Sequence, residues 1–345
     1  MSGPKDYRLS ETENRRIFHE QIVPDLLAGR DGQADPTTVV LLGQQGSGKT
    51  RISHVIAQEL NRRGGFIDLD SDLVKPFHPA YAELMELDDQ QMALHVGPDA
   101  RQWTHQARAY AQEHRLNILA HDTAGDARFS ADLLKGHRQA GYRVQVMSLG
   151  VPRALSDQGV LNRYYEQVQD RGQGRLSVPE KVEAAYTGML EYADIVDAQR
   201  LADSVSVYRR GESKPRYINL LSSGQWEEPP RFRQALREAR NTPWSPQETE
   251  AFLRVQDKLR VGMGPEFQDQ LSVISQHARP LLHHETAAAW KGPKAAPGRP
   301  AGMAAAARLR STTDTRRPEA TARPAPGSPP AASPPDHTKR SGPKR

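Results

Sequence analysis

The sequence has no cysteine, no run of 18 apolar residues and no apolar stretch near its start. Without cysteine, the chain can form neither a disulfide framework nor a thiolate metal site. The lack of long apolar runs argues against a transmembrane helix, and the polar residues 1–7 are unlike a secretory signal peptide. These absences predict a cytoplasmic protein without a membrane partner.

Short apolar segments alternate with helical patterns between about residues 10 and 225. Strands are predicted at residues 39–42, 66–69, 116–120 and 142–149, with one or two more within 193–201 and 205–208. Helices are predicted at about 9–29, 50–61, 128–139, 153–169 and 179–192, with a mixed helical region over about 80–113. The alternation predicts an α/β fold in which a parallel sheet is covered by helices on both faces.

A helical extension is predicted to follow this core. Residues 231–275 are amphipathic, and the run W-S-P-Q-E at 244–248 is typical of a helix start. We therefore expect one folded domain over residues 1–285, with its core at about 10–225 and its extension at about 226–285.

The net charge of +5 belongs to the end of the chain. Residues 291–345 contain 12 Lys or Arg against 3 Asp or Glu, whereas residues 1–290 contain 35 basic and 39 acidic residues. The same last segment holds 11 of the 26 prolines. We expect residues 286–345 to form a disordered Ala/Pro/Arg-rich tail, either simply solvated or in contact with nucleic acid or acidic partners.

Residues 43–50 match the phosphate-loop pattern G-x-x-x-x-G-K-[ST] between a predicted strand and a predicted helix. The loop consists of Gly43, Gln44, Gln45, Gly46, Ser47, Gly48, Lys49 and Thr50. Glycines let backbone N–H groups close around phosphates, and the helix N-terminus favours the same anion. Lys49 is placed to reach the β- and γ-phosphates and Thr50 to bind Mg²⁺, so the loop predicts a nucleoside triphosphate site. A plain glycine-rich turn is the alternative.

Polar residues also follow two other predicted strands. After the strand at 66–69 come Asp70 and Asp72, which strand alternation would point to one side. After the strand at 116–120 come His121, Asp122 and Thr123. Since carboxyl ends of parallel strands meet at one edge, these residues are expected beside the phosphate loop. Phosphoryl transfer to an alcohol needs a proton acceptor, and we favour Asp72, although either aspartate could instead cap a helix or turn.

Two arginines lie where a mobile lid is predicted. Arg163 is within the helix at 153–169, and Arg175 ends the glycine-rich loop that follows it. Arginines on a lid can neutralise charge on a transferring phosphoryl group once the lid closes. Surface salt bridges are the alternative for each of them.

The run D-T-A-G at 122–125 resembles the second switch of GTPases. The guanine-specifying N-K-x-D pattern is absent downstream, and a switch-one threonine loop is not evident. We therefore favour contact of His121, Asp122 and Thr123 with an acceptor substrate or the metal, with an ordinary half-buried histidine as the alternative for His121.

Five ordered motifs together resemble the zeta-toxin family over roughly residues 10–225. They are G-Q-x-G-S-G-K-T, then I-D-x-D-x-D before His78-Pro79, then G-Y-x-V leading to G-V-P, then Arg163-Tyr164, and a G-x-G-R loop. The resemblance implies a phosphate-loop kinase fold that uses ATP and Mg²⁺. It also implies phosphorylation of the sugar 3′-hydroxyl of UDP-N-acetylglucosamine by the toxin of a toxin–antitoxin module.

The resemblance further implies a role for each matched residue. Asp72 corresponds to the catalytic base, Lys49 and Thr50 to the triphosphate and Mg²⁺ ligands, and Arg163 and Arg175 to the clamp on the γ-phosphate. Thr123 corresponds to the threonine of the family's Glu-Gly-Thr substrate motif. The expected substrate-binding set is Asp70, Lys75, His78, His121, Asp122, Thr123 and Arg128.

This chain departs from the family at the acceptor side. The motif's glutamate is replaced by His121 and its glycine by Asp122, while the expected arginine is Gly125, with Arg128 only nearby. Another hydroxylated acceptor, such as a nucleotide or an antibiotic, therefore stays open. So does a non-catalytic, nucleotide-dependent regulatory module. An antitoxin, if one exists, is expected to occlude the ATP site.

Overall fold

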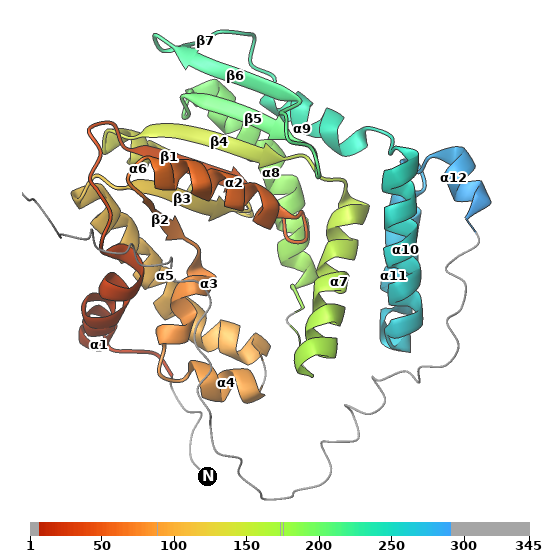
Figure 1. Ribbon diagram of the computed structural model, residues 1–345, viewed down its shortest axis with the longest axis horizontal. Coiled ribbons are helices and arrows are strands. Elements are labelled where there is room, and N and C mark those ends of the chain that lie inside the picture. The colour runs from red at the N-terminus through yellow and green to blue at the C-terminus, as the bar shows by residue number, and fades with distance from the viewer. Residues whose placement is uncertain (1–6, 88, 173, 175, 291–345) are drawn as a thin grey trace, which may run out of the picture. The chain divides into compact units, whose positions relative to one another are not determined.

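The centre of the fold is a sheet in which a parallel block carries an antiparallel edge (Figure 1). In the computed structural model, the residues described are 7–87, 89–172, 174 and 176–290, and they belong to one compact unit. The strands are β1 Thr37–Leu42, β2 Phe66–Leu69, β3 Asn117–Asp122, β4 Arg143–Leu149, β5 Ser204–Tyr208, β6 Tyr217–Ser222 and β7 Gln225–Trp226. Their order is β2-β3-β1-β4-β5-β6-β7, parallel from β2 to β5. This confirms the predicted α/β fold.

Helices connect the strands and continue beyond the sheet. Those before β4 are α1 Glu11–Ile17, the π-helical η1 Phe18–Leu27, α2 Lys49–Arg62, α3 Ser71–Val74, the 3₁₀ turn η2 Lys75–Phe77, α4 Tyr81–Leu87, α5 Asp89–Glu113 and α6 Ala127–Gln139. Those after β4 are α7 Arg153–Arg171, α8 Pro179–Gln199, α9 Phe232–Asn241, α10 Pro246–Gly262, the 3₁₀ turn η3 Pro265–Phe267, α11 Gln268–Ala278 and α12 His284–Ala289. No helix among the residues described is both long and apolar enough to span a bilayer.

Side chains of β1 alternate between two apolar cores because successive strand residues point to opposite faces. Val40 and Leu42 belong to the core under α6 and α8, whereas Val39 packs with Ile56 of α2 on the other face. A further core between α1, η1, α5 and strands β2 and β3 contains the fully buried Trp103. Both faces of the central strands are therefore covered, which leaves the strand ends as the place for a ligand.

The segment 193–201, predicted as a strand, is mostly the end of α8. Met189, Ala193 and Val196 continue one buried helical stripe at spacings of four and three residues. The helix ends where Arg200 adopts a left-handed conformation with φ 54°. The prediction was wrong because a short apolar run has no clear period of its own.

The antiparallel edge was not predicted. Strands β6 and β7 are joined by Ser223 and Gly224, whose φ values of 51° and 75° are those of a tight hairpin turn. Serine is an unusual residue at the first of these positions, so the turn carries only a weak sequence signal. Strand β3 also extends two residues beyond its predicted end, which places His121 and Asp122 within the strand.

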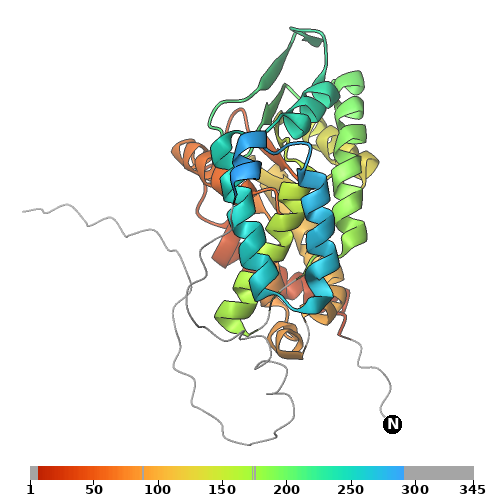
Figure 2. The same ribbon diagram turned by 90° about the vertical axis from the view of Figure 1, so that its right-hand side faces the viewer.

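The helical extension packs on α7. Ser245 and Glu248 form the reciprocal hydrogen bonds of a capping box, which confirms the predicted helix start at 244–248. Phe252 of α10 and Leu271 of α11 share a core with Leu161 of α7. Figure 2 shows α10 and α11, teal and blue, lying along the lime-green α7. The extension therefore supports the helix that carries Arg163.

The predicted tail lies mainly outside the described residues, which end at Trp290. Its first residues, however, include helix α12 at His284–Ala289. The side chain of His283 accepts a hydrogen bond from the Thr286 N–H and caps this helix. Residues 286–289, which fall within the predicted tail, therefore belong to a helix.

Replacing Asp197 by asparagine should stabilise the protein above pH 6. Burial raises the pKa of Asp197 from 3.8 to about 6, although its Oδ2 accepts a hydrogen bond of 2.8 Å from the Phe232 N–H. A raised carboxyl pKa contributes stability in full below the unfolded value, and this contribution is lost as pH rises through about 6. Asparagine keeps an acceptor oxygen without the charge. Thermal unfolding between pH 4 and 8 should show a Tm advantage of the variant that grows up to neutral pH.

The matched control for this pH dependence is Asp132→Asn. Asp132 is an exposed residue of α6 that pairs with Lys135 at 2.9 Å, so its loss should lower stability slightly at neutral pH. The two variants are thus expected to differ in sign. A Tm difference for Asp197→Asn that does not change with pH would contradict the assignment.

Candidate functional site

A cavity of about 670 Å³ opens at the carboxyl ends of β1, β2 and β3. These strands are neighbours in the sheet, so the segments that follow them lie side by side. Of the residues predicted from the sequence, those that line the cavity are Gln44, Gln45, Gly46, Ser47, Gly48, Lys49, Thr50, Asp70, Asp72, His121, Thr123 and Arg163. Gly43 begins the loop, where its N–H donates to the Asp122 carbonyl at 3.0 Å.

Lys49 lies inside the phosphate loop. Its ammonium donates to the Gly43 carbonyl and, at 3.3 Å, to the Gln44 carbonyl. Burial lowers the pKa of Lys49 to about 8, against the opposing attraction of Asp70 and Asp122. A cation in such a position gains most from an anion that enters the loop.

The phosphate loop is fastened to α7. Ser156 donates to the Gln45 carbonyl at 2.5 Å, and the Gln44 amide donates to the Val151 carbonyl at 2.9 Å. Gly159 of α7 comes so close that a Cβ on it would lie 2.4 Å from the Gly46 carbonyl oxygen. Because the loop and α7 touch in this way, Arg163, one turn further along α7, has a defined position relative to the loop.

Substituting Gly159 by alanine should therefore weaken ATP binding. The added methyl group forces α7 and the loop apart, and overpacking of this kind costs about 1–3 kcal/mol. We expect the Kd for ATP to rise about tenfold in a titration calorimetry experiment. Gly136→Ala in α6 is the matched control, because nothing lies within 4 Å of its added Cβ. Equal affinities in both variants would show that the close contact does not hold the loop.

Asp70 and Asp72 reach the cavity by a different route from the one predicted. They do not alternate along a strand, because helix α3 begins at Ser71. Asp70 caps that helix by accepting a hydrogen bond of 2.9 Å from the Asp72 N–H. The Asp72 carboxylate, in the first turn of α3, pairs with the buried Lys75 ammonium at 2.5 Å. Lys75 does not line the cavity and acts as the partner that positions Asp72.

His121 lines the nucleotide cavity, whereas its neighbour Asp122 does not. The His121 Nε2 lies 3.2 Å from Oδ1 of Asp68, a β2 residue that also lines the cavity and was not predicted. Asp68 is the first aspartate of the I-D-x-D-x-D motif and a polar residue within the apolar run F-I-D-L, but neither pattern assigns it a role. Asp122 accepts a hydrogen bond of 2.8 Å from the Ala124 N–H and lies outside this cavity.

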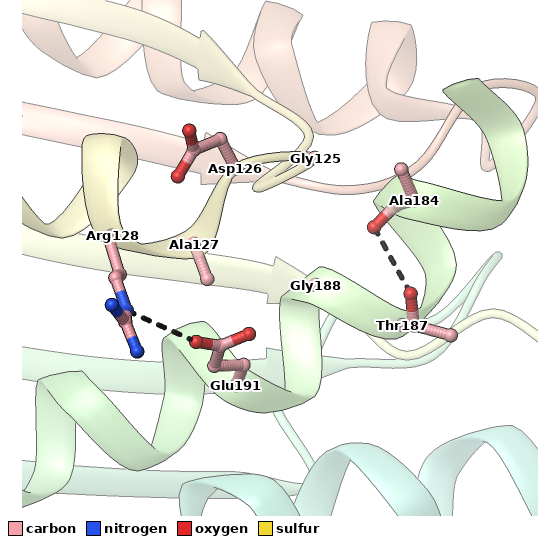
Figure 3. A pocket seen from close by; sticks show the side chains of 8 residues that line it. All are labelled: Gly125, Asp126, Ala127, Arg128, Ala184, Thr187, Gly188 and Glu191. Carbon is pink, nitrogen blue, oxygen red and sulfur yellow. Dashed lines mark hydrogen bonds and ion pairs between the residues drawn. The ribbon is translucent and has the colours of Figure 1, made fainter. Parts of the chain in front are cut away.

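His78 and Arg128 are not brought to the cavity. The buried His78 ring lies with its Nε2 3.4 Å from the buried Asp99 carboxylate of α5, so it joins two parts of the core. Arg128 lies in a separate surface pocket between α6 and α8, where it pairs with Glu191 at 3.7 Å (Figure 3). We assign His78 a structural role and find Arg128 away from the loop. Arg175 lies outside the described residues.

Further polar residues of the cavity were not predicted. The helix that carries Arg163 also contributes Asn162 and Glu166 to the cavity wall. The Arg163 side chain itself donates a hydrogen bond of 3.2 Å to Ser177. Arg210, which follows β5, lines the cavity next to Gly48 and donates to the Leu155 carbonyl at 3.4 Å. No local sequence motif marks Arg210 as a cavity residue, because only the fold brings the end of β5 to the phosphate loop.

The sequence matches the family model described as Zeta toxin over residues 26–220. Toxin zeta of Streptococcus pyogenes is 27% identical over 140 residues, which are 41% of this chain and 48% of that protein. Toxin PezT of Streptococcus pneumoniae serotype 4 is 23% identical over 192 residues, 54% of this chain and 74% of that protein. The chain thus spans about half the length of the curated toxin zeta proteins that it matches.

The fold is also similar to a solved structure. That structure belongs to a study of the PezAT chromosomal toxin–antitoxin system of Streptococcus pneumoniae. The two share a TM-score of 0.62 at 18% identity, over 74% of this chain and 98% of that one. At this level of identity the similarity concerns the fold alone.

Proposed function

This chain belongs to the zeta toxin family, and from that premise we propose that it is an ATP-dependent kinase for a hydroxyl group of a small molecule. The observation that carries the proposal is that a phosphate loop, a carboxylate and an arginine line one cavity at the strand ends. A triphosphate site alone would need only the loop. The added groups are those that phosphoryl transfer to an alcohol requires.

In the proposed reaction, the acceptor oxygen attacks the γ-phosphorus while the bond to the β–γ bridging oxygen breaks. The hydroxyl proton passes to the Asp72 carboxylate, which Lys75 orients through their ion pair. Lys49 balances charge on the β- and γ-phosphates. Arg163, with Arg175, neutralises the transferring phosphoryl group, and ADP leaves with the negative charge of the broken bond.

Mg²⁺ fits the oxygen donors of the cavity. Thr50, Asp68 and Asp70 supply a hydroxyl and carboxylates at the cavity wall, and the buried Asp68 Oδ1 makes no hydrogen bond, although it lies 3.2 Å from His121 Nε2. Mg²⁺ in phosphate-loop sites binds one or two protein oxygens together with substrate phosphates, and the described residues hold no cluster of three metal-ligating side chains. When bound, the ion would offset negative charge on the phosphates.

The leading acceptor candidate is UDP-N-acetylglucosamine at its sugar 3′-hydroxyl, with Thr123, His121, Asp70 and Asp122 on the acceptor side. His121 paired with Asp68 occupies the place of the family's glutamate. A neutral imidazole donates one hydrogen bond and accepts another, unlike a carboxylate, which only accepts. A different hydroxylated acceptor, such as a nucleotide or an antibiotic, is therefore the second candidate.

We further propose that the chain is the toxin of a toxin–antitoxin module and that a cognate antitoxin covers the ATP cavity. The basis is the similarity to toxin zeta and to a structure from the PezAT toxin–antitoxin system. The kinase would comprise residues 1–285, with the basic segment 286–345 as a dispensable tail, and would act in the cytoplasm.

The test is incubation of the full chain with ATP, Mg²⁺ and a panel of nucleotide sugars, nucleotides and aminoglycoside-like alcohols. Mass spectrometry should detect one added phosphate on the true acceptor. Product on other compounds but not on UDP-N-acetylglucosamine would replace the leading substrate. Tight ATP binding without product on any of them, together with loss of function when 291–345 are deleted, would instead support the regulatory module.

A further inference from the structure

Arg210 follows strand β5 and lies against the start of helix α2. A Cβ on Gly48 would lie 3.3 Å from the Arg210 Nε and 3.8 Å from its Cζ, so the guanidinium packs on the last glycine of the phosphate loop. Both residues line the nucleotide cavity. The neighbouring Arg209 is buried instead and pairs with Glu248 of α10 at 3.0 Å. Of two adjacent arginines, one therefore joins parts of the fold and the other belongs to the cavity wall.

Arg210 has no acidic partner within the part of the chain that the structure describes. Its one hydrogen bond there is long, 3.4 Å from Nη1 to the Leu155 carbonyl. Burial lowers the pKa of Arg210, and no nearby carboxylate opposes that shift. A guanidinium carries five N–H donors in a fixed fork, so most of the donors of Arg210 are left for water or a ligand.

The surroundings of this guanidinium are already positive. The N-terminus of a helix carries about half a positive charge from its unpaired N–H groups. No side chain caps α2, because Gly48 holds the N-cap position with φ 85°. The Lys49 ammonium adds a full charge within the same loop. An anion bound at this place would be attracted by all three groups.

The two cations lie at opposite ends of the phosphate loop. Lys49 bonds the carbonyls of Gly43 and Gln44 at the start of the loop. Arg210 packs on Gly48 at its end. In a phosphate loop the backbone N–H groups surround the α- and β-phosphates, while the lysine reaches the β- and γ-phosphates. The end of the loop beside Arg210 is therefore the place of the α-phosphate.

We propose that Arg210 binds the α-phosphate of the donor nucleotide. The inference rests on the proposed kinase function and assigns donor recognition to a residue outside the phosphate loop. A guanidinium fork matches the oxygens of a phosphate in pairs. ATP and ADP both carry the α-phosphate, so Arg210 stabilises substrate and product alike. Such uniform binding lowers KM for ATP without raising kcat.

Arg210→Met tests the proposal, with Arg210→Lys as the variant that keeps the charge. ADP, a non-hydrolysable ATP analogue and inorganic triphosphate are titrated into the full chain by calorimetry. We expect Arg210→Met to weaken binding of all three by about tenfold or more, and Arg210→Lys to restore part of the loss. A loss confined to the ATP analogue would place Arg210 on the γ-phosphate and overturn the proposal. A loss for both nucleotides but not for inorganic triphosphate would place it on the base, with the same consequence.

Thermal unfolding separates a binding role from a structural one. Without nucleotide, Arg210→Met should melt at the same temperature as the wild type or higher, because a cation without an anion is removed from the N-terminus of α2. With ADP present, the order should reverse. A lower Tm without nucleotide, together with unchanged ADP affinity, would make Arg210 a structural residue only.

Arg62→Met is the matched control for loss of a positive charge on the same helix. Arg62 lies at the other end of α2, where it forms an exposed pair with Glu59 at 3.3 Å. Its replacement should leave the affinities for ADP and for the ATP analogue as they are. An equal loss of affinity in Arg62→Met and Arg210→Met would show that only the net charge of the protein matters, which would reject the specific contact.

The outcomes also distinguish this inference from the proposed function. ADP binding that depends on Arg210, without phosphorylation of any acceptor, would keep the α-phosphate contact and reject the kinase. Phosphorylation with the same KM for ATP in wild type and Arg210→Met would keep the kinase and reject the contact. In the expected case, Arg210→Met raises KM for ATP by about tenfold and leaves kcat and KM for the acceptor as they were.

Discussion

Asp72→Ala is expected to reduce phosphotransfer by about 10²- to 10⁴-fold, the contribution typical of a general base. The Asp72 carboxylate lines the nucleotide cavity at the start of α3 and is oriented by the buried Lys75. Asp72 belongs to α3 and not to the phosphate loop, so ATP binding should change by less than about twofold, well under 1.4 kcal/mol. Turnover is measured by product mass and ATP affinity by calorimetry.

Asp132→Ala is the matched control for this experiment. Asp132 also pairs with a lysine three residues along its helix, Lys135, but lies on the exposed face of α6. Its loss should change neither turnover nor ATP binding. Wild-type turnover in Asp72→Ala would reject the base assignment, and a parallel loss of ATP affinity would indicate a role for Asp72 in binding the nucleotide.

The position of the phosphate loop could be predicted because its residues carry a local signal. Glycines, Lys49 and Thr50 at fixed spacing identify the loop, and alternating strands and helices identify the sheet whose edge it occupies. Parallel pairing then brings the ends of β2 and β3 beside it, as found for Asp70, Asp72 and Thr123. Arg163 could be predicted from the family resemblance, and its place in the wall of the same cavity follows from the packing of α7 on the loop.

Other features depend on contacts between distant residues and leave little trace in the sequence. His78 is buried because Asp99, on another helix, lies beside it. Helix α5 lies within the region 80–113, for which the apolar pattern predicted only mixed helix. The last turns of α8 and the hairpin of β6 and β7 likewise depend on packing.

Lys49→Ala should abolish both phosphotransfer and any toxicity of the expressed chain. Its ammonium is the one cation held inside the phosphate loop, on the Gly43 and Gln44 carbonyls, among the residues described. Charge-assisted bonds to phosphate are worth about 1.5–3 kcal/mol each, so we expect ATP affinity to fall at least tenfold. Growth inhibition on induced expression should disappear together with turnover.

Substitutions of Lys49 should also reduce activity without reducing thermal stability. Burial lowers its pKa to about 8, so the protonated ammonium is disfavoured in the folded protein and its removal should not lower Tm. Lys49→Met, which keeps the aliphatic stem, should behave like Lys49→Ala, whereas Lys135→Ala on α6 should retain activity. Retained toxicity in Lys49→Met, with ATP binding lost, would point to an action independent of kinase chemistry.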